Sequence, residues 1–328
     1  MKNKKNLAMT ALWLAALVCS LLLADKLMRR DDSERKYGAF FADQQGFDVL
    51  FMGTSRVLDA ISPLELWRDW GITSYNMGNN SEPLAMTHQV LKLAMGVHKP
   101  KVVVVDTFYM SHALNEEWAY PYRHMFLDAV PFGRDKIDLV KAAFPQSEWQ
   151  EFLMPFSLYH GRWDEILSGQ GERMVDCEPY MMGGELRPTQ MWRKDYKLTD
   201  AAYEEELPGA QALRDIAALC RENNIELVLT ALPGHASEQE QMAMNSAIPV
   251  AEELGVPMIN MMPMGIINNQ KDCCDYEGHL NPRGASKVTA FLGVWLAENY
   301  DLEDRRGDHA YAYWDENLKK YEARRAQV

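Results

Sequence analysis

The stretch GFDVLFMGTSR, residues 46–56, decides the fold. Its apolar run, Val49 to Met52, is typical of a short strand buried on both faces. Gly53 ends the run, and Ser62-Pro63 predicts a helix start, because proline fits the first turn of a helix. Ser55 is therefore expected just past the carboxyl end of a central strand, where open α/β sheets bind ligands. A serine there acts as a nucleophile if a base reaches it, and otherwise only caps a turn.

Strand and helix patterns alternate along most of the remaining chain. Further strands are expected at residues 74–77, 101–107, 225–232 and 256–261. Helices are expected at residues 83–97, 209–223, 238–254 and 282–300. Strands that alternate with helices at these spacings indicate an α/β protein with a parallel, doubly wound sheet and right-handed crossovers.

Between residues 114 and 201 this alternation is lost and aromatic residues become frequent. Helical pieces are expected at residues 135–143 and 146–153. We interpret the segment as a mostly helical insertion that covers or flanks the site. Its aromatic side chains either form a small core of their own or stack on sugar rings, and a core is favoured for most of them.

A second motif, DYEGHLNPRG, occupies residues 275–284 near the end of the expected sheet domain. Together with the Gly-x-Ser block at residues 53–55, it resembles the SGNH/GDSL hydrolases, in particular bacterial membrane-anchored members related to D-alanyl-transfer and alginate O-acetylation proteins. The resemblance covers residues 48–300. It implies a three-layer, flavodoxin-like fold with a central parallel sheet.

The resemblance also implies a catalytic triad. Ser55 is the implied nucleophile, His279 the general base, and an acidic residue just before His279 the group that orients it. The family's acid stands three residues before the histidine, where this chain has Tyr276. Asp275 is preferred as the triad acid because a loop can absorb a shift of one residue, and Glu277 is the alternative.

The oxyanion hole is where this chain departs from the family. The resemblance implies donation from the backbone amides of Ser55 and Gly78, since glycine lets the backbone approach the substrate oxygen closely. The family's third block supplies an asparagine, but the expected strand end at residues 102–107 has none. Asn79 and Asn80 are candidates to replace it.

Five residues are candidates for contact with substrate. Asp106 ends an expected strand and points toward the same crevice, and His112 follows shortly after it. Tyr159, His160 and Arg162 form a cluster of polar-tipped side chains within the insertion, of the kind that lines ligand pockets. A surface loop for His112, and packing within the insertion for the cluster, are the alternatives.

The N-terminus carries an apolar run at residues 7–24, preceded by Lys2, Lys4 and Lys5. As a helix, 18 residues span about 27 Å, close to the hydrocarbon thickness of a bilayer. We expect residues 1–30 to be a single-pass anchor with an extracytoplasmic catalytic domain, and a cleaved signal peptide is the alternative. Residues 31–300 would then form the α/β domain, beginning with a polar connector of some helical character at 31–45. Residues 301–328 would form a charged tail, with a peripheral helix as the alternative.

The net charge and the sequence motifs limit the partners and cofactors that the chain is expected to bind. The net charge of −13 argues against a nucleic-acid partner, because phosphate binding needs a basic surface. The chain has no P-loop and no G-x-G-x-x-G, so no cofactor is expected. Its five cysteines include no C-x-x-C motif. A metal-dependent hydrolase that uses Asp106, His112 and His235 is an alternative, but no ligand-spacing motif supports it, so no metal is expected.

The sequence therefore predicts a serine esterase or O-acyltransferase that acts on a cell-envelope polysaccharide or acylated glycan through an acyl-enzyme. A membrane acyl-carrier or acyltransferase protein is the expected partner. Hydrolysis and transfer use the same residues, so both stay open. The alternative is a catalytically weak or inactive protein that keeps the fold and binds or assembles glycan.

Overall fold

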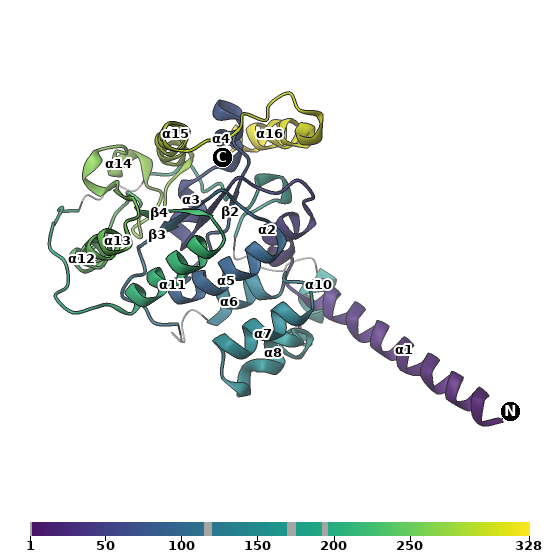
Figure 1. Cartoon of the computed structure of the whole chain (residues 1–328). Coiled ribbons are helices and arrows are strands. Elements are labelled where there is room, and N and C mark those ends of the chain that lie inside the picture. Colours follow the sequence, from purple (N-terminus) through teal and green to yellow (C-terminus); the bar gives the residue numbers. More distant parts are fainter. Residues whose placement is uncertain (1, 115–119, 169–174, 192–195) are drawn as a thin grey trace. The chain divides into compact units, whose positions relative to one another are not determined.

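The computed structural model describes residues 2–114, 120–168, 175–191 and 196–328 (Figure 1). The chain forms two compact units. The helical unit comprises residues 1–31 and 131–174, and the sheet unit comprises residues 32–130 and 175–328. This division differs from the expected one, because only part of the 114–201 segment separates from the sheet and residues 301–328 belong to the sheet unit. Within that segment, residues 115–119, 169–174 and 192–195 lie outside the described residues.

The sheet unit is built on a five-stranded parallel sheet with strand order β2-β1-β3-β4-β5. The strands are β1 Val49–Met52, β2 Ser74–Asn76, β3 Val102–Asp106, β4 Glu226–Ala231 and β5 Met258–Asn260. Strands β1 and β3 are buried throughout, as their unbroken apolar runs predicted. The α/β class and the parallel sheet are confirmed. Strands β2 and β3 lie on opposite sides of β1, so the direction in which strands are added reverses after β2. The switch point, where ligands bind in such sheets, therefore lies between β1 and β3.

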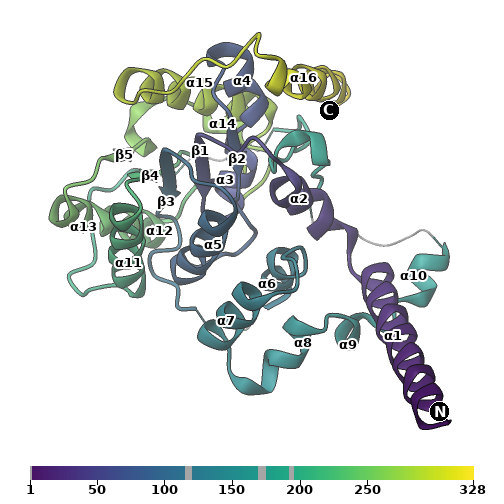
Figure 2. The ribbon, with the colours of Figure 1, turned by 45° about the vertical axis from the view of Figure 1, so that its right-hand side comes forward.

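Helices cover both faces of this sheet. Figures 1 and 2 show α4, α15 and α16 on one side and α5 and α11 on the other. The helices of this unit are α2 Asp31–Ala42, α3 Ser55–Ala60, α4 Pro63–Trp70, α5 Leu84–Val97, α6 Tyr120–Leu127, α11 Pro208–Glu222, α12 Glu238–Asn245, α13 Ala247–Leu254, α14 Asn269–Asp272, α15 Pro282–Asn299 and α16 Ala312–Arg325. Short 3-10 turns are η3 Pro179–Met181, η4 Met262–Met264 and η5 His309–Tyr311.

One expected helix is divided, and one helix was not expected. The helix expected at 238–254 is divided at Ser246 into α12 and α13. Pro249 lies in the first turn of α13, where its missing N–H costs nothing. In the interior of one continuous helix, the same proline would remove a hydrogen bond and break the helix. Helix α3 was not predicted, because its six residues are too few to show a helical period.

Residues 31–45 have the expected helical character, but they pack into the sheet unit and do not form a polar connector. Helix α2 buries Lys36, Tyr37 and Phe40 against the sheet unit. The Lys36 ammonium donates to the carbonyls of Asn76 at 3.1 Å and Gly183 at 2.5 Å, so this buried charge is hydrogen-bonded. Burial lowers the Lys36 pKa to about 8.

Residues 301–328 are not a separate tail. The indole of Trp314 on α16 is fully buried and stacks on Trp67 of α4, with ring centroids 5.3 Å apart. The Tyr321 hydroxyl donates to the Glu65 carboxylate at 2.8 Å. Helix α16 therefore covers the outer face of α4, and its charged residues are the solvent-facing side of an amphipathic helix.

The helical unit contains α1 Lys2–Met28, α7 Arg134–Ala143, η2 Gln146–Glu148, α8 Trp149–Leu153, α9 Phe156–Tyr159 and α10 Trp163–Ser168. Helix α1 is long and apolar enough over residues 6–28 to cross a membrane, a test that a signal sequence also passes. Phe144 stacks on Phe152 with ring centroids 4.2 Å apart, so some of the aromatic residues form a small core, as expected.

Replacing Trp314 with Ala tests whether α16 is part of the folded core. We expect the free energy of unfolding to fall by about 3–5 kcal/mol, because a fully buried indole leaves a cavity. The control is Val294→Ala on the outer face of α15, where the side chain is 46% exposed and the change should stay within about 0.5 kcal/mol. Urea unfolding followed by circular dichroism measures both, and equal stabilities would show that α16 is dispensable.

Candidate active site

Ser55 begins helix α3 directly after strand β1, at the carboxyl edge of the sheet. Gly53 makes the turn between them with φ +143°, and a Cβ there would lie 2.9 Å from Val57 and 3.1 Å from Asp106. Only glycine fits this conformation and this space. Thr54 caps the helix, and its hydroxyl accepts from the Arg56 amide at 3.3 Å. The turn therefore fixes the Ser55 side chain at the expected place.

His279 lies in the loop that leads into α15. Asn281 caps this helix, and its side-chain oxygen accepts from the amides of Arg283 at 3.1 Å and Gly284 at 3.2 Å. The His279 carbonyl accepts from the Cys274 amide at 2.8 Å. The backbone on both sides of the imidazole is thus tied down, and the ring has little freedom to turn away.

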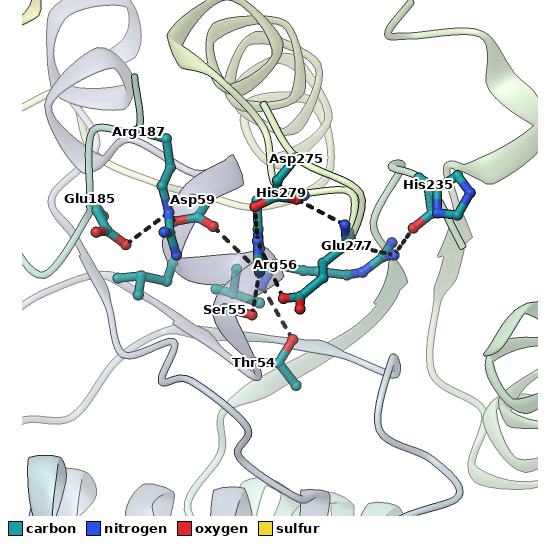
Figure 3. Close-up of polar contacts among 12 residues, drawn as sticks. Thr54, Ser55, Arg56, Asp59, Glu185, Arg187, His235, Asp275, Glu277 and His279 are labelled. Atoms are coloured by element: carbon teal, nitrogen blue, oxygen red, sulfur yellow. Dashed lines mark hydrogen bonds and ion pairs between the residues drawn. The ribbon is translucent and has the colours of Figure 1, made fainter. Parts of the chain in front are cut away.

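The side chains of Ser55, His279 and Asp275 form one hydrogen-bonded row (Figure 3). Ser55 Oγ lies 2.8 Å from His279 Nε2, and Asp275 Oδ2 lies 2.6 Å from His279 Nδ1. A carboxylate at Nδ1 holds the proton there and leaves Nε2 as the acceptor for the serine proton. Glu277 Oε2 is 3.9 Å from Nδ1 and its side chain is 56% exposed, so Asp275 makes the closer contact.

The Asp275 carboxylate is stabilised in its ionised form. Burial acts to raise its pKa, but the hydrogen bond from the His279 ring and those from the amides of Glu277 at 3.0 Å and His279 at 3.2 Å outweigh burial and lower the pKa below its ordinary value. Asp275 is therefore negatively charged at neutral pH, as a group that stabilises an imidazolium must be.

The histidine loop packs closely on the loop after β4. Gly278 has φ +84°, and a Cβ there would lie 2.4 Å from the His235 carbonyl oxygen. A Cβ on Gly234 would lie 2.5 Å from the Gly278 carbonyl oxygen. Two glycines thus let the two backbones touch. His235 contributes its backbone carbonyl to this region.

Arg56, the residue after the serine, is a buried positioning residue that the sequence reasoning missed. Its guanidinium donates to the carbonyls of His235 and, at 3.3 Å, Glu277. It also lies over the Phe108 ring, 3.9 Å from the centroid. Arg56 therefore links the helix that carries Ser55 to the loop that carries His279. The signal in the sequence was a charged residue inside an otherwise buried stretch.

A second carboxylate also approaches the imidazole. Asp59 follows Ser55 by one helical turn on α3, and its Oδ2 lies 3.8 Å from His279 Nε2. Its Oδ1 accepts from Arg187 Nε at 3.1 Å, and Glu185 Oε2 lies 3.3 Å from the same nitrogen (Figure 3). Burial, and then the Asp59 charge, raise the Glu185 pKa to about 8. At neutral pH Glu185 is therefore protonated, and Arg187 contacts both carboxyl groups.

The expected oxyanion donors are largely engaged within the protein. The Gly78 amide donates to the Asn76 side-chain oxygen at 3.0 Å, and the Asn79 side-chain amide donates to the Tyr122 carbonyl at 2.9 Å. Asn80, in the turn that follows, is half-buried. Ser55 is the first residue of α3, so its amide has no acceptor within that helix. The Ser55 amide is the expected donor with the clearest opportunity to meet a substrate oxygen.

Asp106 is not a crevice-lining residue. Its side chain is buried and accepts from the Leu232 amide at 3.0 Å and the Phe108 amide at 3.2 Å, which ties the ends of β3 and β4 together. Burial raises its pKa to about 6. His112 is half-buried and stacks on Tyr109, with ring centroids 4.2 Å apart. No group of three His, Cys, Asp or Glu residues in the described ranges could hold a metal ion.

Tyr159, His160 and Arg162 belong to the helical unit, whereas Ser55 belongs to the sheet unit. Arg162 donates to the Met28 carbonyl at 2.8 Å, and its guanidinium lies 5.5 Å from the centre of the Tyr159 ring. The His160 ring meets the Ser157 carbonyl at 2.8 Å. These contacts lie within the helical unit and are those of local packing.

Comparison with known proteins assigns the chain to no family. No protein-family model matches the chain, and no curated protein matches it. The assignment of the site therefore rests on the residues and on the geometry described above.

Replacing Asp275 with Asn should lower the rate of p-nitrophenyl acetate hydrolysis by about 10²–10⁴-fold, because the amide favours the wrong imidazole tautomer and cannot stabilise its charged form. Glu277→Gln is the matched control and should change the rate less than about threefold. The opposite ranking of the two variants would make Glu277 the triad acid.

Glu185→Gln tests the buried proton next to Asp59. Because the Glu185 pKa is raised from 4.5 to about 8, the folded chain keeps a proton that the unfolded chain releases, and stability falls as the pH rises through that window. Glutamine does not titrate, so the variant should lose part of this decline in urea unfolding measured from pH 5 to pH 9. The exposed Glu298→Gln should keep the wild-type slope, and parallel curves for all three proteins would contradict the assignment.

Proposed function

We propose that the chain is a serine esterase or O-acyltransferase of the SGNH type that acts through Ser55, His279 and Asp275. The observation that carries the proposal is the row of hydrogen bonds that joins these side chains, 2.8 Å from serine to histidine and 2.6 Å from histidine to aspartate. A nucleophile bonded to a base, and a base bonded to an orienting acid, together make the arrangement that acyl transfer needs.

The reaction has two halves. His279 Nε2 takes the proton of Ser55 Oγ as the oxygen attacks the ester carbonyl, and Asp275 stabilises the imidazolium. The tetrahedral intermediate places its oxyanion near the Ser55 amide. His279 then gives the proton to the departing alcohol, which leaves an acyl-serine. Water or a sugar hydroxyl loses a proton to His279, attacks the acyl group and releases Ser55.

The proposed substrate is an acylated cell-envelope polysaccharide, and the proposed partner is a membrane acyl-carrier or acyltransferase protein. Support comes from the resemblance of residues 48–300 to membrane-anchored SGNH proteins and from α1, which has the length and composition of a membrane span. Lys2, Lys4 and Lys5 before the apolar run favour a cytoplasmic N-terminus and hence a cell-membrane protein with an extracytoplasmic site.

One observation favours the second candidate, a weak or inactive glycan-binding protein with the same fold. The Gly78 amide is bound to Asn76, and strand β3 ends in Asp106 where the family has an asparagine donor. Loss of one oxyanion donor costs about 10²–10³ in kcat. The proposed enzyme is therefore expected to be slow on unactivated esters.

The two candidates separate on an O-acetylated polysaccharide incubated with the full chain in detergent micelles. The proposed function predicts release of acetate, or its transfer to an added glycan, and Ser55→Ala should abolish both while leaving the circular dichroism spectrum unchanged. Binding of the polysaccharide by wild type and Ser55→Ala with equal affinity, without acetate release or transfer by wild type, would establish the binding protein instead.

A further inference from the structure

The carboxyl-terminal end of α1 is built into the helical unit. The Asp25 carboxylate accepts from the Phe156 amide at 2.7 Å, and Arg162 donates to the Met28 carbonyl at 2.8 Å. Met28 is fully buried, whereas the apolar side chains earlier in α1 are exposed. The residues that follow the apolar run at 7–24 are therefore fastened to α9 and to the turn before α10.

Helix α10 presents an apolar stripe that nothing in the described chain covers. Trp163, Ile166 and Leu167 recur at the i, i+3 and i+4 spacing of one helix face, and they are 52%, 39% and 82% exposed. Glu165 lies on the opposite face, and Asp164 lies at the side of the stripe. Met154 and Leu158, in the segment that leads to α10, are 51% and 40% exposed. We call these five apolar residues the foot.

The depth of the foot relative to the bilayer follows from its attachment to α1. A helix crossing the bilayer with the run at 7–24 in the hydrocarbon would bring Asp25 and Met28 out at the headgroups. Arg162 bonds to Met28 and directly precedes α10, and Figures 1 and 2 show α10 beside that end of α1. Trp163 then lies at the depth where tryptophan is enriched in membrane proteins.

We propose that the foot lies in the headgroup region of the bilayer that α1 crosses, with the stripe of α10 turned toward the acyl chains. The proposal rests on the membrane anchoring within the proposed function, and not on its chemistry. Burial in the bilayer would explain why an apolar stripe is exposed next to a spanning helix. It would also hold the helical unit in one orientation at the membrane surface.

The partner is the apolar part of the lipid surface and not its charge. The polar face of α10 carries Asp164 and Glu165 and no basic residue, and Arg162 is bonded to Met28 and, at 2.9 Å, to Glu165. Interfacial helices that depend on anionic lipid carry lysine or arginine on the polar face. Insertion of the foot should therefore not require anionic lipid.

Nitroxide labels on the full chain in phosphatidylcholine vesicles test the proposal. Labels at Ile166→Cys and Leu167→Cys report on the foot, and a label at Glu165→Cys reports on the opposite face of the same helix. Asp138→Cys on α7, where the side chain is 63% exposed and paired with Arg134, is the water reference. These variants carry Cys19→Ser, and labelled native Cys19 is the bilayer reference, since the other four cysteines are buried. The readout is collision with oxygen relative to a nickel chelate in water.

We expect the oxygen-to-nickel ratio at 166 and 167 to exceed that at 165 and 138 by roughly threefold or more, with or without phosphatidylglycerol in the vesicles, since apolar burial does not depend on headgroup charge. Ratios at 166 and 167 equal to that at 138, with a lipid-like Cys19, would overturn the foot and leave the proposed function intact. A lipid-like foot only in the presence of phosphatidylglycerol would overturn its apolar mechanism. A water-exposed Cys19 would overturn the anchoring and the foot together.

Discussion

The hydrogen bond between Ser55 and His279 is the contact on which the account of this protein depends, because it joins residues 224 positions apart. Each partner is fixed locally, the serine by the glycine turn after β1 and the histidine by the tied loop before α15. Arg56 then links the two elements by donating to the carbonyls of His235 and Glu277. A chance meeting of a surface serine and histidine would need none of this support.

The surroundings of the imidazole hold more charge than a stable core requires. Arg56 and Asp59 have buried side chains, and burying an ion costs several kcal/mol unless partners compensate. The compensation is specific, since Asp59 meets Arg187 on one side and approaches His279 on the other. On the histidine side of the site, hydrogen bonds join Ser55, His279 and Asp275, whereas on the oxyanion side the Gly78 amide is bound to Asn76. This imbalance predicts a competent nucleophile with limited stabilisation of the transition state.

Sequence patterns were sufficient where they reported on local structure. Apolar runs located the strands, and the two motifs led to Ser55, His279 and Asp275, whose atoms meet. They were insufficient where tertiary contacts decide. From sequence alone a charged residue such as Arg56 is expected at the surface, whereas the structure places it against a ring and two carbonyls. The Gly78 amide is likewise expected to be a free donor, whereas the structure shows it bonded to the Asn76 side chain. The charge of residues 301–328 likewise concealed the buried face of α16.

Fluorophosphonate labelling of the full chain tests the central claim most directly, because the reagent reacts only with an activated serine. The account predicts one added phosphonyl group on Ser55, identified by mass spectrometry of its peptide. It also predicts no addition in Ser55→Ala, and labelling slowed by about 10³-fold or more in His279→Ala, which lacks the base. A folded wild-type protein that does not react, or a Ser55→Ala variant that reacts equally, would contradict it.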